Sequence, residues 1–186
     1  EILADVVDEL AAVLGGSAPS LEQLQQLPLL ERVIKESMRV LSPVPWKGRV
    51  TDKDTELGGY HLPAGTEVFV GITQTHHMPE LYSNPESFDP SRWETITPTA
   101  YEYNPFSAGP RICIGASFAM MEIKIILAML LQRYRLEYVP QQRIDRSGVI
   151  VMMPKHGMSM KVHEQDRQFQ AGVGSVQGNI RDMVNL

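Results

Sequence analysis

Apolar residues recur at spacings of three and four in three parts of the chain, and this period predicts three helices. The first covers residues 1–14 and ends at Gly15-Gly16, because glycine readily takes the left-handed conformation that caps a helix. The second covers residues 30–41 and ends at a pair of prolines, which lack an amide donor. The third, 116–134, is apolar on adjoining faces and is therefore predicted to be largely buried.

Short runs bounded by turn residues predict small β-sheets, before and after the third helix. The predicted strand runs are 48–50, 67–72, 135–139, 149–153 and 158–162. Residues 75–110 are rich in Pro, Asn, Ser and Asp, and predict an irregular loop with one short helical patch at 78–82. So long a loop in a compact domain usually carries function. The predicted fold class is mainly α with small β-sheets.

The two ends of the chain differ from its middle. Residues 164–186 combine glycines with polar residues, and we interpret them as a tail of uncertain order after a body at 1–163. The first helix has no initiator methionine and no N-cap residue ahead of it, which indicates a chain that starts within an element.

Composition excludes several classes of function. The 17 basic and 22 acidic residues give a net charge of -5, so no nucleic-acid partner is expected. The most apolar stretch, 123–131, contains Lys124 and is far shorter than the ~20 residues that cross a bilayer. No membrane span is predicted, and the location is expected to be cytoplasmic if no anchor precedes this segment. The single cysteine excludes intrachain disulfides and four-cysteine metal sites, and the adjacent His76 and His77 lack the spacing of a helical zinc pair.

The most informative segment is the loop that leads into the third predicted helix. Cys113 lies where free backbone amides and the helix dipole favour a thiolate, so it is a candidate ligand or nucleophile. The alternative is a small buried residue. Arg111 offers a planar cation for carboxylates and Phe106 an apolar face, while Gly109 and Gly115 allow a flat ligand to approach the backbone. Together these residue types predict a haem-binding site.

The same segment, from Phe106 to Gly115, resembles the cysteine-ligand signature of cytochrome P450, the haem-thiolate monooxygenases. Ala119 also falls where that family commonly has alanine. The resemblance spans residues 1–162 and implies the C-terminal part of the P450 fold, an incomplete domain. It implies haem b as the cofactor and Cys113 as the axial thiolate, catalytic residue and iron ligand. A thiolate donates electron density to the iron and favours cleavage of the O–O bond of dioxygen.

Glu36 and Arg39 match a Glu-x-x-Arg motif of the family. Their spacing alone describes an exposed ion pair on a polar helix face, which contributes little to stability. The resemblance instead implies a buried structural triad, with Arg92 of the proline-rich loop as its third member. That triad would hold the loop beneath the haem.

The resemblance suggests four further site residues. Arg49 matches an arginine that binds a haem propionate in relatives, and the alternative is a charge on an edge strand. Trp46 lies in a segment that touches substrate in relatives, as does the turn at Ser147 and Gly148.

The implied function is that of a haem-thiolate oxidoreductase, a monooxygenase that inserts one oxygen atom from dioxygen into a small apolar organic substrate. The implied electron donor is a ferredoxin or a flavoprotein reductase. The distal helix that delivers protons in relatives has no counterpart in this sequence, so the segment alone is expected to be inactive. The alternatives are a haem-binding fragment without turnover, a relative that rearranges peroxides, and an interaction module that binds no haem.

Overall fold

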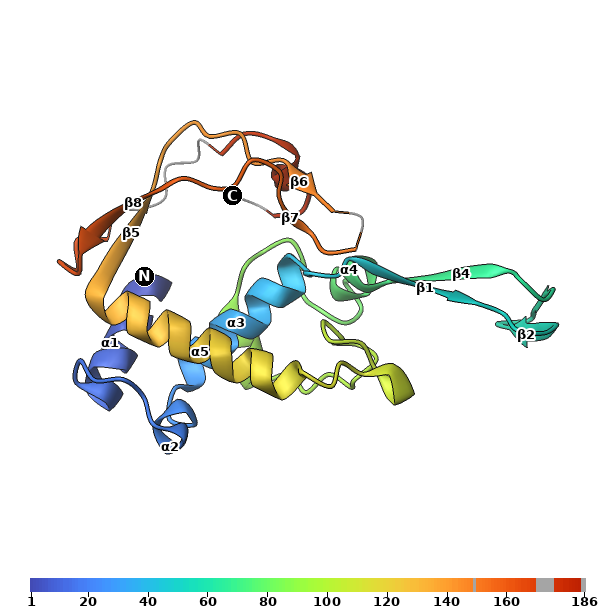
Figure 1. Cartoon of the computed structure of the whole chain (residues 1–186), viewed down its shortest axis with the longest axis horizontal. Coiled ribbons are helices and arrows are strands. Elements are labelled where there is room, and N and C mark those ends of the chain that lie inside the picture. Colours follow the sequence, from blue (N-terminus) through green and yellow to red (C-terminus); the bar gives the residue numbers. More distant parts are fainter. Residues whose placement is uncertain (149, 170–175, 185–186) are drawn as a thin grey trace.

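A computed structural model describes residues 1–148, 150–169 and 176–184 (Figure 1). Its α-helices are α1 (Ile2–Leu14), α2 (Leu21–Leu24), α3 (Pro28–Val40), α4 (Ile72–His76) and α5 (Ala116–Arg133). Its 3-10 helices are η1 (Pro90–Glu94), η2 (Gly109–Arg111) and η3 (Asn179–Asp182). Its strands are β1 (Trp46–Val50), β2 (Thr55–Leu57), β3 (Tyr60–Leu62), β4 (Glu67–Gly71), β5 (Tyr134–Tyr138), β6 (Arg146–Ser147), β7 (Met153–Pro154) and β8 (Met160–Glu164). The predicted class, mainly α with small sheets, is confirmed.

The core lies between α1, α2, α3 and α5, as Figure 1 shows at the blue and yellow end of the molecule. The predicted end of α1 is confirmed: Gly15 is left-handed with φ of 55°, and its amide donates to the carbonyl of Ala11. The buried apolar residues of this core are Val6, Val7, Leu10, Leu14, Leu24, Leu27, Leu30, Ile34, Met38, Ala128 and Leu131. None of the helices in the described part of the chain is long and apolar enough to cross a membrane.

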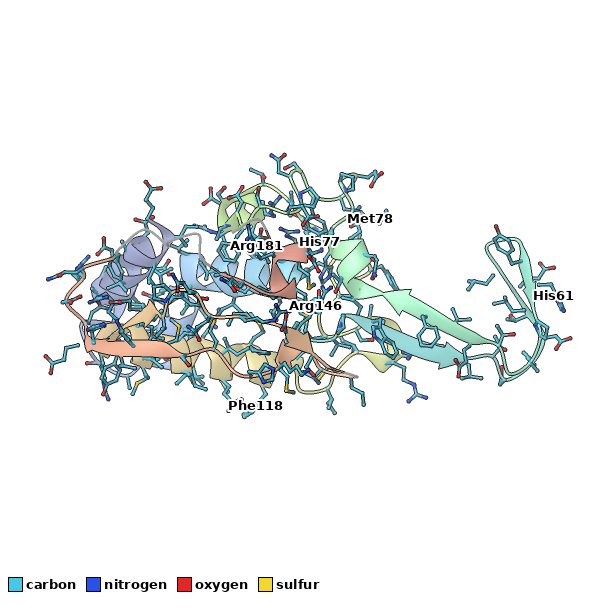
Figure 2. The ribbon with its side chains drawn as sticks, turned by 90° about the horizontal axis from the view of Figure 1, so that it is seen from above. His61, His77, Met78, Phe118, Arg146 and Arg181 are labelled. Carbon is cyan, nitrogen blue, oxygen red and sulfur yellow. The ribbon has the colours of Figure 1, made fainter. Side chains whose placement is uncertain are left out.

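Helix α5 begins at its predicted residue and ends one residue earlier than predicted, but the prediction that it is largely buried is wrong. Of its residues only Ala128 and Leu131 are buried. Phe118 is 62% exposed and Ile126 is 53% exposed, because no other described element covers that side of the helix. Figure 2 shows Phe118 pointing away from the body of the molecule. The apolar pattern therefore identified the helix without identifying what packs on it.

A long hairpin projects from the helices, with His61 near its far end (Figures 1 and 2). Strands β1 and β4 are antiparallel, with Trp46 opposite Gly71, and β2 pairs with β3 at the tip. The predicted strand 67–72 is one residue too long, and the predicted helical patch at 78–82 is a turn. The helix lies earlier, at α4, because the carbonyl of Pro45 accepts hydrogen bonds from the amides of Ile72 and Thr73 and holds that turn against the body.

After α5, strand β5 pairs with β8 and β6 pairs with β7, all antiparallel. The predicted strand 149–153 is wrong over residues 150–152, and Val149 lies outside the described residues. The amide of Met152 donates instead to the carbonyl of Pro43 at 2.7 Å, so this segment bonds to a loop rather than to a strand. In the predicted tail, Met183 and Val184 are buried beside Val40. The division of the chain at residue 163 stays a prediction.

Candidate functional site

The loop before α5 is closed by backbone hydrogen bonds. The amide of Cys113 donates to the carbonyl of Phe106 at 2.9 Å, and the amide of Ser107 donates to the carbonyl of Asn104 at 2.9 Å. Gly109 lies at φ of 67°, the left-handed region that glycine occupies without steric cost. These contacts turn the chain back on itself and present the cysteine at the start of the helix.

Cys113 is a free cysteine with an exposed side chain, so the interpretation as a small buried residue is wrong. Its carbonyl accepts from the amide of Ala116, and the carbonyl of Gly115 accepts from the amide of Ala119, which begins α5. Gly115 itself has an ordinary φ of -87°. A Cβ at this position would lie 3.9 Å from Cys113 Sγ, which is an ordinary van der Waals contact.

A cavity of about 750 Å³ lies against this loop, a volume within the range of small-molecule and cofactor sites. It brings together Cys113, Arg111, Phe106 and Arg49 of the predicted site, from loops and from β1. Gly109, Gly115 and Ala119 support the loop but do not line the cavity. Its lining residues are Val44, Lys47, Gly48, Arg49, Val50, Glu67, Phe69, Ile72, Pro105, Phe106, Ser107, Arg111 and Cys113.

The cavity is basic, with three cations against the single acid Glu67. Lys47 is a site residue that the sequence analysis missed. Its ammonium donates to the hydroxyl of Ser107 at 3.0 Å, and burial, then the neighbouring charge of Arg49, lowers the pKa of Lys47. Side chains alternate along a strand, so the i, i+2 spacing of Lys47 and Arg49 on β1 was the signal that could have found it. Arg49 donates only to the carbonyl of Gly48 among the contacts of the described residues.

The three predicted substrate residues do not line this cavity. Trp46 packs edge-on against Phe69, with ring centroids 5.2 Å apart, and lines a separate hollow at the base of the hairpin. Ser147 and Gly148 line a third hollow of about 340 Å³ beside Pro45. The family resemblance assigned all three to substrate contact, which stays a prediction, and the fold places them in two hollows other than the Cys113 cavity.

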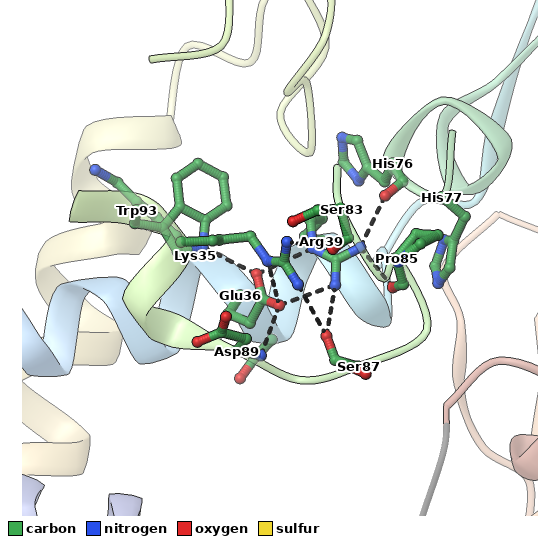
Figure 3. A network of polar contacts seen from close by, with 12 residues as sticks. Lys35, Glu36, Arg39, His76, His77, Ser83, Pro85, Ser87, Asp89 and Trp93 are labelled. Atoms are coloured by element: carbon green, nitrogen blue, oxygen red, sulfur yellow. Dashed lines mark hydrogen bonds and ion pairs between the residues drawn. The ribbon is translucent and has the colours of Figure 1, made fainter. Parts of the chain in front are cut away.

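The structure brings Glu36, Arg39 and Arg92 into one buried network outside the cavity, drawn in Figure 3. Arg39 binds both carboxylate oxygens of Glu36, at 2.9 and 3.0 Å, and Arg92 Nε donates to Oε1 at 3.0 Å. The backbone amide of Asp89 and the indole of Trp93 also donate to the carboxylate. Because the side chains of Glu36 and Arg39 are 0% exposed, an exposed surface pair is excluded.

The two arginines extend this network to the irregular loop. Arg39 donates to the carbonyls of His76, Pro85 and Ser87, and Arg92 donates to those of Ser83 and Ser87. Burial alone would raise the pKa of Glu36, but the hydrogen bonds and charges of Arg39 and Arg92, with the amide of Asp89, outweigh it and hold that pKa below its ordinary value. The carboxylate is therefore ionised and fully bonded.

His76 is a buried polar residue that the sequence analysis also missed, since an adjacent pair of histidines in a loop gave no helical or metal-site pattern. It is 0% exposed, and its Nε2 accepts from the amide of Asn104 at 3.1 Å. Nδ1 must then carry the proton and donate to the hydroxyl of Ser42 at 2.9 Å. Burial and the nearby charge of Arg39 lower the pKa of His76 to about 4, so the ring is neutral near pH 7.

The donor set at the cavity fits haem. Among the residues that the structure describes, no group of three or more His, Cys, Asp and Glu side chains lies close enough to hold a metal ion. A metal held by Cys113 must therefore bring its other ligands with it, as haem iron does. The cations Lys47, Arg49 and Arg111 lie on the same cavity and suit propionate groups, and Phe106 and Phe69 suit a porphyrin face.

Comparison with known proteins agrees with this geometry. Residues 1–162 match the family model described as "Cytochrome P450". Cytochrome P450 4c21 of Blattella germanica is 40% identical over 144 residues, which are 75% of this chain and 29% of the relative. Cytochrome P450 4V2 of Mus musculus is 37% identical over 175 residues, 89% of this chain and 33% of the relative. Cytokinin hydroxylase of Arabidopsis thaliana is 36% identical over 165 residues, 87% and 32% of the two chains.

A solved structure, "Retinoic acid bound cyanobacterial CYP120A1", superposes with a TM-score of 0.79 at 31% identity. The superposition covers 88% of this chain and 38% of that one. The chain thus spans about a third of the length of the relatives that it matches. Since the family match runs from residue 1 to residue 162 and includes the whole cysteine loop, the chain belongs to the cytochrome P450 family.

Proposed function

We propose that this chain forms the cysteine side of the haem site in a monooxygenase that inserts one oxygen atom from dioxygen into an apolar organic substrate. The observation that carries the proposal is the position of the exposed Cys113 thiol on the wall of a basic cavity, at the start of α5. The thiolate is the form of cysteine that ligates iron. Family membership supports the same chemistry.

Each cavity residue has a proposed part. Cys113 holds the iron, and the hydrogen bond from its amide to Phe106 fixes the direction in which the sulfur points. Arg111, Arg49 and Lys47 bind the propionates by charge-assisted hydrogen bonds. Phe106 excludes water from one side of the ring. The Glu36 network lies outside the cavity and has a structural part, holding the irregular loop against α3.

Haem, when bound, supplies the oxygen and electron-transfer chemistry, and the protein supplies the ligand, the orientation and the local field. The two electrons are proposed to come from a ferredoxin or a flavoprotein reductase. The relatives include a cytokinin hydroxylase and a structure with bound retinoic acid, which are different ligands. Because Trp46, Ser147 and Gly148 lie away from the Cys113 cavity, no substrate beyond the apolar class is proposed.

The test is a spectrum of the intact protein loaded with haem, reduced and exposed to carbon monoxide. A thiolate ligand gives a strongly red-shifted Soret band, so the wild type should show this band and Cys113→Ala should lose it. Ser117→Ala, an exposed residue of the first turn of α5, is the matched control and should keep it. Retention of the red-shifted band by Cys113→Ala would show that another residue ligates the iron.

For residues 1–186 alone, we propose weak haem retention and no turnover. Ile112 is 57% exposed and Ile114 is 104% exposed, so the surface beside the sulfur is open to water in this segment. Substrate oxidation by the isolated segment with a ferredoxin-type donor would contradict this part of the proposal.

A further inference from the structure

The segment 176–184 lies beyond the family match, which ends at residue 162, and it binds residues 142–146, which lead into the hairpin formed by β6 and β7. Figure 1 shows the two side by side. The amide of Gln177 donates to the carbonyl of Gln142 at 3.0 Å, and the carbonyl of Gln177 accepts from the amide of Ile144 at 2.8 Å. The amide of Ile180 donates to the carbonyl of Ile144 at 3.3 Å. This segment is therefore held along its backbone.

Side chains make the docking specific. The side-chain oxygen of Asn179 accepts from the amide of Arg146 at 2.8 Å, and the amide of Asn179 donates to the carboxylate of Asp145 at 3.0 Å. Met183 and Val184, 5% and 9% exposed, pack against apolar residues at the end of α3 and on the hairpin. Specific hydrogen bonds at Asn179 and apolar packing at Met183 and Val184 thus both hold the segment in place.

Gly178 fits where no larger residue could. Its φ is 97°, in the region that favours glycine, and a Cβ at this position would lie 2.4 Å from the carbonyl oxygen of Ile144. Substitution to alanine would force segment and hairpin apart. Gly16 offers a matched control, since its φ is 88° and a Cβ there meets no atom within 4 Å.

The hairpin in turn supports the wall of the Cys113 cavity. The amide of Met152 donates to the carbonyl of Pro43, and the carbonyl of Pro45 accepts from the amides of Ile72 and Thr73. Between the two prolines lies Val44, which lines the cavity. This wall consists of residues 43–45 with Ile72 and Thr73. Val44 and Ile72 line the Cys113 cavity, and Pro45 and Thr73 line the hollow of about 340 Å³. The lining of that hollow is Pro45, Thr73, Gln74, Arg146, Ser147, Gly148, Met152, Asn179 and Met183.

We infer that the segment 176–184 is a positioning element for the cavity: through Gly178 and Asn179 it fixes the hairpin, and through Met152 the hairpin fixes the wall at Pro43 to Pro45. The contacts form one continuous path from the segment to Val44, which lines the same cavity as Cys113. The position of this wall decides the width of the cavity, so the segment takes part in setting which ligands fit.

The test is hydrogen–deuterium exchange of the intact protein without ligand. In Gly178→Ala, the amides of Ile144, Arg146 and Met152 should exchange at least about tenfold faster than in the wild type, and those of Ile72 and Thr73 should also accelerate. Gly16→Ala should leave all five unchanged. Amides in α1 should keep their rates in Gly178→Ala, which separates a local effect from general destabilisation.

A second substitution keeps the test decisive if Gly178→Ala does not fold. Asn179→Ala removes one hydrogen bond and should accelerate exchange at Arg146 and Met152 by about fivefold. Asn179→Asp keeps the acceptor and should restore most of the protection. The inference is overturned if both alanine variants leave Met152, Ile72 and Thr73 unchanged, or if aspartate restores nothing.

A titration with hemin links the exchange result to the cavity, and this part rests on the proposed function. Gly178→Ala should bind hemin about fivefold more weakly than Gly16→Ala, the change expected for one misplaced contact. Equal affinities would overturn the role in ligand fit. Failure of the wild type to bind hemin would refute the proposed function, while the exchange result would still decide the positioning role.

Discussion

The Glu36 network and the Cys113 cavity differ in whether their charged groups are buried and paired. Glu36 is 0% exposed and accepts hydrogen bonds from two arginines, an indole and a backbone amide. Cys113 is exposed, and the arginines beside it form no ion pair within 4.0 Å in the described part of the chain. A buried charge with complete partners cannot lose one of them without destabilising the fold, whereas unpaired cations beside a free thiol provide groups for a ligand. The difference separates a structural centre from a binding site.

The largest effect is expected from breaking the structural centre. Glu36→Ala leaves Arg39 and Arg92 buried without their carboxylate, which should cost about 3–5 kcal/mol of unfolding free energy and prevent folding of a marginally stable protein. Chemical denaturation followed by circular dichroism measures it.

Glu31→Ala is the matched control for that substitution. Glu31 lies on the same helix and pairs with Lys35 and Lys124, but it is 36% exposed, so its loss should change the stability by less than about 1 kcal/mol. Equal effects of the two substitutions would mean that the buried network has no special structural part.

A smaller effect is expected from protonating His76. The pKa of an unfolded histidine is near 6.5, and that of His76 in the fold is about 4, so the unfolded chain takes up the proton first as the pH falls. The stability that His76 contributes is complete above about pH 6.5 and is lost progressively toward pH 4. The loss should reach about 3 kcal/mol, measured as unfolding free energy against pH.

His76→Gln should flatten that pH dependence between pH 6.5 and 4, while His61→Gln at the exposed tip of the hairpin should leave it as in the wild type. An unchanged slope in His76→Gln would assign the acid sensitivity to other groups. The Glu36 carboxylate adds to the acid sensitivity only below about pH 5, because its pKa in the fold is lowered and the unfolded carboxyl takes up its proton first.

The smallest effect is expected at the cavity, and there it should appear in ligand binding and not in stability. Arg49→Gln removes one proposed propionate contact and should weaken hemin binding about tenfold, the value of one charge-assisted hydrogen bond. The free energy of unfolding without ligand should change by less than about 0.5 kcal/mol.

Lys53→Gln, farther along the same hairpin and outside the cavity lining, is the control for Arg49→Gln. Equal hemin affinities in the two variants would favour the other interpretation of Arg49, a charge on an edge strand.

Local sequence patterns predicted the position of helix α5 well, but they did not predict which other segments pack against a helix or pair with a strand. The spacing of apolar residues gave α5 to within one residue, because helix period is a property of the segment itself. Its burial depends on what packs against it, which the pattern does not contain, and so Phe118 was expected inside and lies outside. The strand predicted at 149–153 failed because Met152 bonds to Pro43, more than a hundred residues away.

The candidate site shows the same difference between residues placed by a local motif and residues placed by long-range contacts. Cys113, Arg111 and Phe106 are near one another in sequence, so their meeting at one cavity could be predicted from one motif. Lys47 could have been found from its i, i+2 spacing to Arg49, but His76 reaches its position through a contact with the distant Asn104, and no motif contained it. The meeting of Glu36 with Arg92 was expected only from family resemblance, since their spacing along the chain has no local geometric meaning.

The Glu36 network also constrains the order in which the protein can fold during synthesis. Arg92 follows Glu36 by 56 residues, which a ribosome adds in roughly 3–11 s at usual rates of translation. Through that interval the carboxylate has Arg39 as its only charged partner from the network. Helix α3 can form early, but the Glu36 carboxylate can lose its contact with water only after Trp93 has left the exit tunnel of the ribosome. Docking of the irregular loop on α3 therefore follows the synthesis of residue 93.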